Sequence, residues 1–570
     1  MRLILSSRGL AFLLVLIVIA VPVAAASPDP ARGTGGAVAS AAPAATEAGL
    51  EILRAGGNAV DAAVATAIAL AVVHPQAGNL GGGGFVVARI DGEVSALDFR
   101  EAAPAAAGHD MYLDAKGDPI SEKSLVGPLA AGVPGSPAGL WELHRRYGSL
   151  DWARVVAPAA KLAADGFVVT PRLEESVAKA AKLLGRFPET AAVWLPGGKP
   201  PAAGSVMKIP DLAATLHAYA EKGPAAITGG ALAAAIETVS DRHGGILTVA
   251  DLEAYRPVWR EPISFNAFGW NVVSMPLPSS GGIILGQTTG LLERVDWRPA
   301  PRFGAERARL LVEAWRRAYA DRLLLGDPST TRATAADLLD QGWLDSRALE
   351  LDSPRATPSA DVSSWSASDV PESTETTHLS VADGAGNVVS ITTTLNGSFG
   401  CGLLVPGVGF LLNNEMDDFA AAPGRPNLYG LIQGEANAVG PGKRMLSSMS
   451  PAVAWREHET VALGSPGGST IPTVTAQVLL NVIVDGDDIQ AAVNRPRIHH
   501  QWMPDEIAAE PDALSPETAM ELERRGYRLK DRSRLGEVNA VRVTADGKVE
   551  AAADPRGPGS AGVVRPAPGS

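Results

Sequence analysis

The stretch Glu375-Thr376-Thr377-His378-Leu379-Ser380-Val381 marks the point where the character of this chain changes. Residues 352–375 are dense in Ser, Thr, Pro and Asp, which is typical of an exposed segment. From Thr376 onward polar residues alternate with β-favouring apolar ones, which predicts a strand. A threonine at this junction can become a new chain N-terminus if the backbone is cut in front of it.

Such a cut would give Thr376 a chemistry that an internal threonine lacks. Inside a chain the threonine hydroxyl is a weak nucleophile, because no base is supplied. At an N-terminus the residue's own α-amino group, with an ordinary pKa of about 7.7–8.0, can accept the hydroxyl proton near neutral pH. We therefore expect Thr376 to be a catalytic nucleophile that carries its own base.

A second strand-like run, residues 388–395, follows a turn at residues 383–387. Folding this hairpin symmetrically about Ala385 places Thr394 opposite Thr376, because both lie nine positions from the centre. Directly opposed residues have Cβ atoms about 4.5–5.5 Å apart, within reach of a hydroxyl–hydroxyl hydrogen bond. A slip of one residue would remove this pairing.

Composition describes a globular protein: of 570 residues, 46% are hydrophobic and 19% are charged. The formal net charge of −13 argues against a nucleic-acid partner, which requires a basic surface. Cys401 is the single cysteine, so no intrachain disulfide can form. If the chain is cut, packing alone must hold the two pieces together.

Residues 1–26 are typical of a secretory signal peptide. Arg2 and Arg8 precede an apolar run at residues 10–23, and Ala24-Ala25-Ala26 offers a cleavage site. The alternative is an N-terminal membrane anchor, but the run is shorter than the ~20 residues of a span and polar sequence follows at once. We expect an exported protein, periplasmic or secreted, without a stable membrane anchor.

Residues 49–77 form a long, alanine-rich helical pattern that ends before Gly81-Gly82-Gly83-Gly84. Four successive glycines permit positive φ angles and close approach of the backbone. We interpret them as a tight connection to a strand at residues 85–88.

Several short polar clusters follow Thr376. They are Thr394-Leu395-Asn396, Asn413-Asn414-Glu415-Met416-Asp417-Asp418, Ser447-Ser448-Met449-Ser450-Pro451 and Gly464-Ser465-Pro466-Gly467-Gly468. Taken singly, each has a structural explanation: an acidic turn, helix caps or a backbone bend.

Together and in order, these clusters resemble the γ-glutamyltransferase family, also called glutathione hydrolases. The resemblance extends over nearly the whole chain after the signal. It includes Gly56-Gly57-Asn58-Ala59-Val60-Asp61-Ala62-Ala63, Asp98-Phe99-Arg100-Glu101, the run at 275–282 and Arg495-Pro496-Arg497-Ile498-His499-His500-Gln501-Trp502. It implies the α+β fold of N-terminal nucleophile hydrolases, a four-layer αββα sandwich of two antiparallel sheets flanked by helices.

The resemblance also implies a precursor that cuts itself between Glu375 and Thr376. The expected products are a large subunit (residues 27–375) and a small subunit (residues 376–570), intertwined in one αββα domain. Thr376 would then attack the γ-carbonyl of glutathione or a related compound. The resulting γ-glutamyl ester would be transferred to water or to an amino-acid or peptide acceptor.

Roles for the remaining site residues follow from the same resemblance. Thr394 would hold the nucleophile's hydroxyl, and the backbone N–H groups of Gly467 and Gly468 would form the oxyanion hole. The side chains of Arg100, Ser447 and Ser448 would bind the substrate's α-carboxylate. Those of Asn396, Glu415 and Asp418 would bind its α-ammonium. For Arg100 the alternative is a structural ion pair. Residues 423–434 resemble a lid loop, with Tyr429 covering the bound glutamyl group, which favours small γ-glutamyl substrates.

No cofactor is implied, and the neighbouring His499 and His500 lack a convincing metal-ligand spacing, so we expect no metal. Two other functions remain open. One is a related acylase that acts on β-lactam side chains or polyglutamate; the other is a non-catalytic secreted scaffold that is never cut.

Overall fold

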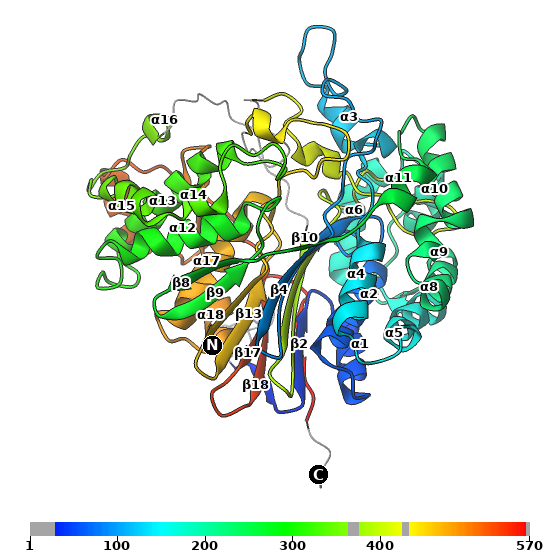
Figure 1. Ribbon diagram of the computed structural model, residues 1–570, viewed down its shortest axis with the longest axis horizontal. Coiled ribbons are helices and arrows are strands. Elements are labelled where there is room, and N and C mark those ends of the chain that lie inside the picture. The colour runs from blue at the N-terminus through cyan, green and yellow to red at the C-terminus, as the bar shows by residue number, and fades with distance from the viewer. Residues whose placement is uncertain (1–28, 363–375, 424–432, 566–570) are drawn as a thin grey trace, which may run out of the picture.

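The computed structural model describes residues 29–362, 376–423 and 433–565. Two seven-stranded antiparallel sheets lie face to face between two groups of helices (Figure 1). This arrangement confirms the αββα sandwich expected from the sequence. The predicted signal peptide at residues 1–26 lies outside the described residues.

The nucleophile sheet, named for the strand that begins at Thr376, mixes strands from both sides of the predicted cut. Its order is β19 (Ser560–Val563), β2 (Gly36–Ser40), β10 (Thr376–Asp383), β11 (Val388–Thr394), β3 (Gly83–Ile90), β4 (Glu93–Asp98) and β7 (Val258–Arg260). β10 pairs with β2 on one side and β11 on the other. A cut before β10 would therefore leave the two fragments sharing one hydrogen-bonded sheet.

The second sheet has the order β1 (Ala31–Gly33), β18 (Val549–Ala553), β17 (Asn539–Val543), β13 (Glu459–Gly464), β12 (Ala452–Arg456), β9 (Trp270–Ser274) and β8 (Ile263–Ala267). Apolar side chains of both sheets form a core between them, including Phe85, Val273 and Val541. Polar groups also cross this layer: the Ser380 hydroxyl donates to the Asn539 carbonyl at 3.0 Å. The centre of the sandwich is thus built by both sheets together.

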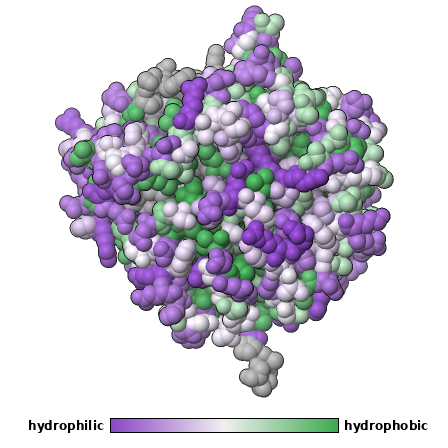
Figure 2. All heavy atoms as spheres, viewed as in Figure 1, coloured by the Kyte–Doolittle hydropathy of each residue, from purple (hydrophilic) through white to green (hydrophobic). Residues whose placement is uncertain are grey.

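Separate helix groups cover the outer faces of the two sheets (Figure 1). The nucleophile sheet is covered chiefly by α1 (Pro43–Arg54), α2 (Ala59–Val73) and α4 (Ser136–Tyr147), with α5 (Trp152–Asp165) and α8 (Pro210–Lys222) outside them. The second sheet is covered by α12 (Gly281–Glu293), α17 (Ile471–Ile483) and α18 (Ile489–Asn494), with α13 (Ala305–Asp321) packed on α12. Polar residues occupy most of the face shown in Figure 2, and apolar ones occur there in small groups.

Further helices and two small sheets lie outside this sandwich core. The remaining helices are α3 (Ser121–Leu125), α6 (Pro171–Leu184), α7 (Pro188–Trp194), α9 (Ala225–Thr228), α10 (Gly230–Arg242), α11 (Val249–Ala254), α14 (Ala335–Leu338), α15 (Gln341–Leu349), α16 (Ser359–Val362) and α19 (Pro516–Arg524). Two small sheets comprise β5 (Phe167–Val168) with β6 (Val206–Met207), and β14 (Ile498–His499), β15 (Ile507–Ala509) and β16 (Leu529–Asp531).

The single helical pattern predicted over residues 49–77 is wrong: two helices, α1 and α2, occupy this region. Gly56 has a φ of +89°, and this left-handed conformation ends the first helix. Glycine suits the position because an L side chain would be strained there. Asn58 then caps α2 through a capping box with Asp61. The predicted strand at residues 85–88 is confirmed within β3, but the predicted connection is shorter than four residues, because Gly83 and Gly84 already belong to β3. These glycines allow close backbone approach: a Cβ added at Gly81 would lie 2.0 Å from the Leu411 carbonyl oxygen.

Candidate functional site

The predicted register of the β10–β11 hairpin is confirmed: Thr376 lies directly opposite Thr394. Asp383 sets the turn, because its carboxylate accepts from the N–H groups of Ala385 and Asn387 at 2.9 and 3.0 Å. Gly386 supplies the left-handed conformation that closes the turn, with a φ of +89°. The threonine pair therefore results from local hairpin chemistry.

Thr376 and Thr394 line a cavity that we call the threonine cavity. Its other predicted residues come from five separate parts of the chain and are Arg100, Asn396, Glu415, Asp418, Ser447, Ser448 and Gly468. Met449, Ile471 and Arg322 complete its lining. The fold thus brings together every predicted site residue that the structure describes except Gly467, which borders a second cavity also lined by Thr376.

The loop after β11 fixes the Thr394 hydroxyl. Asn396 has a φ of +68°, and its backbone N–H donates to Thr394 Oγ1 at 2.8 Å. The Asn396 side chain donates in turn to the Asn414 carbonyl at 3.0 Å. This connects the threonine pair to the acidic segment that carries Glu415 and Asp418.

Gly467 and Gly468 form the turn that leads from β13 into α17. Their φ angles are +132° and +56°, and a Cβ added at Gly467 would lie 2.4 Å from Thr470 Oγ1. Only glycine fits this turn without strain. Gly468 starts the short 3-10 segment that runs directly into α17, and the N-terminus of a helix stabilises negative charge. Backbone N–H groups at this position suit an oxyanion hole beside Thr376.

Arg100 is buried at the wall of the threonine cavity, where it forms ion pairs with Glu415 and Asp418. Burial disfavours its charge, but the two carboxylates outweigh burial and the pKa of Arg100 is raised. Arg100 therefore stays a guanidinium. The contacts of Arg100 in this structure are those of an ion pair, which was the alternative considered from the sequence. Its position in the cavity wall also fits a carboxylate clamp.

The segment after β4 holds Arg100 in position. The Asp98 carboxylate accepts from the Arg100 N–H at 2.9 Å and pairs with Arg260 at 2.7 Å and Arg444 at 2.6 Å. The Tyr255 hydroxyl donates to the Arg100 carbonyl at 2.7 Å. These contacts fix the backbone from which the guanidinium projects.

Two buried carboxylates beside Arg100 titrate abnormally. Burial raises the pKa of Glu101 to about 7, although Arg100, 3.8 Å away, partly opposes the shift. Burial also raises the pKa of Glu415, again against the attraction of Arg100. Acidic groups are thus crowded around one guanidinium, which concentrates both signs of charge in a small polar cavity.

Ser447 and Ser448 are held by the run at residues 275–282. The Ser447 N–H donates to the Pro278 carbonyl at 2.8 Å, and the Ser280 hydroxyl donates to the Ser447 carbonyl at 2.8 Å. Both contacts use the backbone of Ser447, and the side chains of Ser447 and Ser448 line the cavity. The run at residues 275–282, which is part of the family resemblance, therefore supports the serine segment of the cavity.

Arg322 is a cavity residue that sequence reasoning missed. It follows α13, donates to Ser280 Oγ at 3.1 Å and approaches Ser448 Oγ at 3.4 Å. Burial lowers its pKa to about 10, so it remains charged at neutral pH. Among the described residues its Nη1 has no hydrogen-bond partner. Nothing in the local sequence distinguishes Arg322 from the other arginines of α13, so only the fold identifies it.

Two predicted residues, Tyr429 and Glu375, lie outside the described residues. Within residues 29–362, 376–423 and 433–565 no cluster of three or more His, Cys, Asp or Glu side chains could hold a metal ion. No helix in the same ranges is long and apolar enough to cross a membrane. Cys401 is buried and is not disulfide-bonded.

Comparison with known proteins agrees with this geometry. The model of the family described as "Gamma-glutamyltranspeptidase" matches residues 45–564. The "Glutathione hydrolase proenzyme" of Escherichia coli K12 is 43% identical over 531 residues, covering 92% of this chain and 91% of that protein.

Acylases are also similar to this chain. The "Acylase ACY 1 proenzyme" of Pseudomonas sp. SE83 is 36% identical over 535 residues, covering 92% of each protein. The crystal structure of a cephalosporin acylase from Bacillus halodurans superposes with a TM-score of 0.84 at 27% identity, over 95% of this chain and 97% of that one. The chain is therefore similar to relatives of two named activities, glutathione hydrolases and acylases, and shares its fold with the cephalosporin acylase.

Proposed function

The chain belongs to the γ-glutamyltranspeptidase family and is an enzyme of the glutathione hydrolase type, and from this we propose that Thr376 is its nucleophile. One observation carries the proposal: Thr376 lines the same cavity as Arg100, Ser448 and Gly468. A nucleophile, a carboxylate clamp and an oxyanion-stabilising turn are the parts that cleavage of a γ-glutamyl amide requires.

In the proposed reaction, Thr376 Oγ attacks the substrate's γ-carbonyl carbon while the residue's free α-amino group takes the hydroxyl proton. The N–H groups of Gly467 and Gly468 stabilise the negative oxygen that develops. The C–N bond then breaks, the proton passes to the leaving nitrogen, and a γ-glutamyl ester remains on Thr376. Water or an acceptor amine attacks this ester and restores the hydroxyl.

Recognition of the glutamyl end rests on paired charges. Arg100, Ser447 and Ser448 bind the α-carboxylate, since a guanidinium fork and two hydroxyls match its geometry. Asn396, Glu415 and Asp418 surround the α-ammonium. The family resemblance assigns Tyr429, which lies outside the described residues, the role of covering the bound group. Thr394 orients the nucleophile's hydroxyl from the opposite strand.

The α-amino group that serves as base exists only after the chain is cut. A precursor processed into two subunits agrees with the proenzyme names of the relatives. We place the cut between Glu375 and Thr376, which gives subunits of residues 27–375 and 376–570. Thr376 Oγ would attack the carbonyl of Glu375, and water would hydrolyse the resulting ester. Removal of residues 1–26 during export, to the periplasm or the medium, would precede this step.

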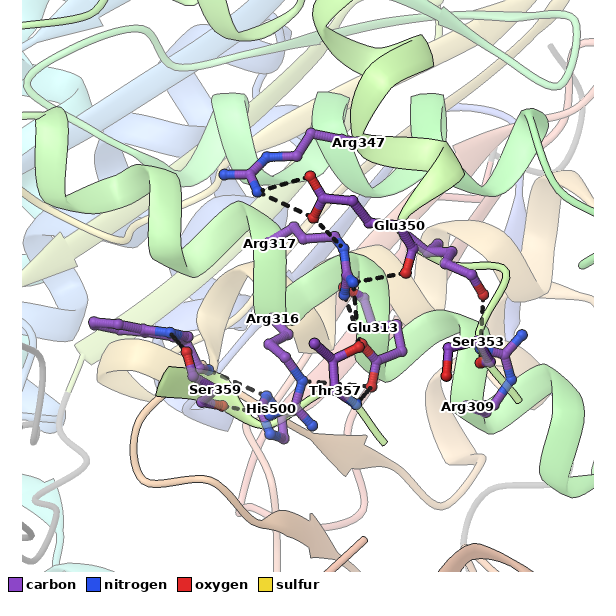
Figure 3. A network of polar contacts seen from close by, with 12 residues as sticks. Arg309, Glu313, Arg316, Arg317, Arg347, Glu350, Ser353, Thr357, Ser359 and His500 are labelled. Carbon is purple, nitrogen blue, oxygen red and sulfur yellow. Dashed lines mark hydrogen bonds and ion pairs between the residues drawn. The ribbon is translucent and has the colours of Figure 1, made fainter. Parts of the chain in front are cut away.

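Contacts across the proposed cut can hold the fragments together without a disulfide (Figure 3). Arg316 of α13 pairs with Asp505, whose carboxylate also accepts from the Ser359 N–H at 2.9 Å. The Trp502 indole N–H donates to the Ser359 carbonyl at 2.7 Å. Ser359, in the described part of the proposed large subunit, is thus bound to the small one, and both seven-stranded sheets contain strands from both fragments.

The direct test is a denaturing gel with N-terminal sequencing of the smaller band. We expect two bands, with the smaller one starting at Thr376. Thr376→Ala should stay uncut and inactive, whereas Thr376→Ser keeps a hydroxyl and should be cut. Thr377→Ala, one residue on and facing the other side of β10, serves as the matched control. An active preparation that consists of one unbroken chain would exclude this mechanism.

An acylase is the second candidate function, favoured by the high structural similarity to the cephalosporin acylase. The charged lining of the threonine cavity argues for a zwitterionic acyl group instead. A substrate that lacks the α-amino group separates the two functions, because only an enzyme that requires the ammonium would discriminate against it.

A further inference from the structure

Thr376 lines two cavities, and the second one is basic. This second cavity, which we call the arginine cavity, is lined by Thr376, Gly467, Arg172, Arg532, Arg534 and Glu537, among others. Its described lining carries three guanidinium groups against one carboxylate, in a protein whose formal net charge is −13. Local positive charge of this kind attracts anions.

The arginines of this cavity are held at its wall and remain partly open to solvent. Arg534 pairs with Glu537 at 2.8 Å and Arg172 with the same carboxylate at 3.4 Å. Their side chains are 31% and 22% exposed, respectively. Because one carboxylate is shared between two guanidinium groups, the pairing leaves positive charge for a further anion.

His74 adds a neutral group to the same wall. It is buried, and burial together with Arg172 lowers its pKa to about 4, so the imidazole is uncharged near neutral pH. Its Nδ1 lies 2.9 Å from Gln76 Nε2. The positive charge of the cavity therefore comes from the arginines alone.

The two cavities meet at the nucleophile. Gly468 lines the threonine cavity and Gly467 the arginine cavity, and Thr376 lines both. A donor whose γ-glutamyl group fills the threonine cavity has its scissile amide at Thr376. Beyond that amide, glutathione carries two further residues that end in a carboxylate. Two extended residues span about 7 Å at most, and Arg172 and Arg534 line the same cavity as Thr376.

We propose that the arginine cavity binds the terminal carboxylate on the amine side of the substrate, through Arg172 and Arg534. The same subsite serves the peptide released from the donor and the amino acid or peptide that accepts the γ-glutamyl group, since both carry this carboxylate. The inference rests on the proposed γ-glutamyl transfer at Thr376. It assigns this enzyme a preference for amine-side groups that end in a free carboxylate.

The test compares two donors that differ in one charge: glutathione and its C-terminal amide. We expect the wild-type enzyme to show a kcat/KM at least fivefold higher for glutathione. In Arg172→Gln/Arg534→Gln this preference should fall to less than twofold. The exposed Arg145→Gln, on α4 and paired with Glu142, is the matched control and should keep the wild-type preference.

Acceptors provide a second readout. Transfer to glycylglycine should be favoured over transfer to glycylglycinamide in the wild type, and the double variant should lose this preference as well. A wild-type enzyme that treats acid and amide alike would overturn the proposal, even if the double variant failed to fold. So would a folded double variant that keeps the preference.

The proposed function is checked separately with γ-glutamyl-p-nitroanilide, whose leaving group has no carboxylate. Release of p-nitroaniline by the wild type shows γ-glutamyl transfer whether or not the arginine cavity selects for carboxylates. If no p-nitroaniline were released, the proposed function would be contradicted, and so would the carboxylate subsite that rests on it.

Discussion

Arg100 and Glu415 form a buried ion pair in the wall of the threonine cavity. A γ-glutamyl group carries the same two charges in its α-carboxylate and α-ammonium. Binding would therefore exchange partners: the substrate carboxylate pairs with Arg100 while its ammonium pairs with Glu415 and Asp418. No net charge is buried in this exchange, which limits the cost of desolvation.

This exchange predicts how the enzyme treats a substrate without the α-amino group. Glutaryl-p-nitroanilide has the γ-glutamyl skeleton but lacks the ammonium, so it would occupy Arg100 and leave Asp418, which also pairs with Arg100, without a cation. Leaving one buried charge unpaired costs about 3–5 kcal/mol. We expect kcat/KM to fall by more than roughly 10²-fold relative to γ-glutamyl-p-nitroanilide. Similar rates for both would favour the acylase alternative.

Arg100→Lys should weaken γ-glutamyl substrates far more than it slows cutting of the precursor. An ammonium cannot reproduce the two parallel hydrogen bonds of the guanidinium fork. The loss of about 1.5–3 kcal/mol corresponds to roughly a ten- to hundredfold lower kcat/KM. Kinetics with γ-glutamyl-p-nitroanilide and the rate of precursor cutting would be measured side by side. Equal effects on the two would contradict the clamp role.

Thr394→Val should reduce turnover through loss of one hydroxyl with little change of shape. Thr394 Oγ1 accepts from the Asn396 N–H at 2.8 Å, opposite Thr376. Removal of the Thr394 hydroxyl should raise the activation free energy by about 1–3 kcal/mol, so kcat should fall roughly five- to 150-fold. Thr393→Val, on the other face of β11, is the control. If Thr394→Val left kcat unchanged, the proposed role of Thr394 in orienting the Thr376 hydroxyl would be contradicted.

Arg322→Lys should raise KM for γ-glutamyl substrates by roughly tenfold, because one hydrogen-bonding arm of the guanidinium is worth about 1.5 kcal/mol. A lysine keeps the charge but cannot reach Ser280 and Ser448 with two arms. If Arg322 were only structural, the thermal midpoint of unfolding would drop while KM stayed constant. Steady-state kinetics and thermal unfolding together distinguish the two.

His378 should make the folded protein acid-sensitive. It is fully buried in β10, and burial lowers its pKa to about 3. The unfolded chain, with an ordinary histidine pKa of about 6.5, binds the proton first as pH falls. Between about pH 6.5 and 3, His378 therefore reduces the free energy of unfolding by about 1.4 kcal/mol per pH unit of acidification.

The measurement is the free energy of unfolding at several pH values below 6.5. His378→Asn should lower the slope against pH by about one proton relative to the wild type. His74 and His500 also have pKa values lowered to about 4, so part of the acid sensitivity should remain. The exposed His458→Asn is the control for loss of a histidine at the surface.

Much of the site could be predicted from local sequence. The hairpin register follows from strand period and a turn centred on Ala385, so the pairing of Thr376 with Thr394 needed no tertiary information. The role of Gly467 came from the family resemblance, because locally the Gly467-Gly468 pair indicates only a backbone bend; the structure adds that its φ is +132°. The region over residues 49–77 was predicted as one helix because its two parts are alike in composition, and the break depends on Gly56 and on the capping box of Asn58 with Asp61.

What the sequence by itself determined is the local chemistry: a threonine at the head of a strand, its partner across the hairpin, and the order of the polar clusters. Only the tertiary structure decided which distant groups face that threonine, because sheet order and helix packing place side chains hundreds of residues apart within one cavity. Arg322 and the arginine cavity are features that only the tertiary structure identified. An arginine on a helix or loop has no sequence signature for the direction in which it points, so its role depends on the packed core behind it.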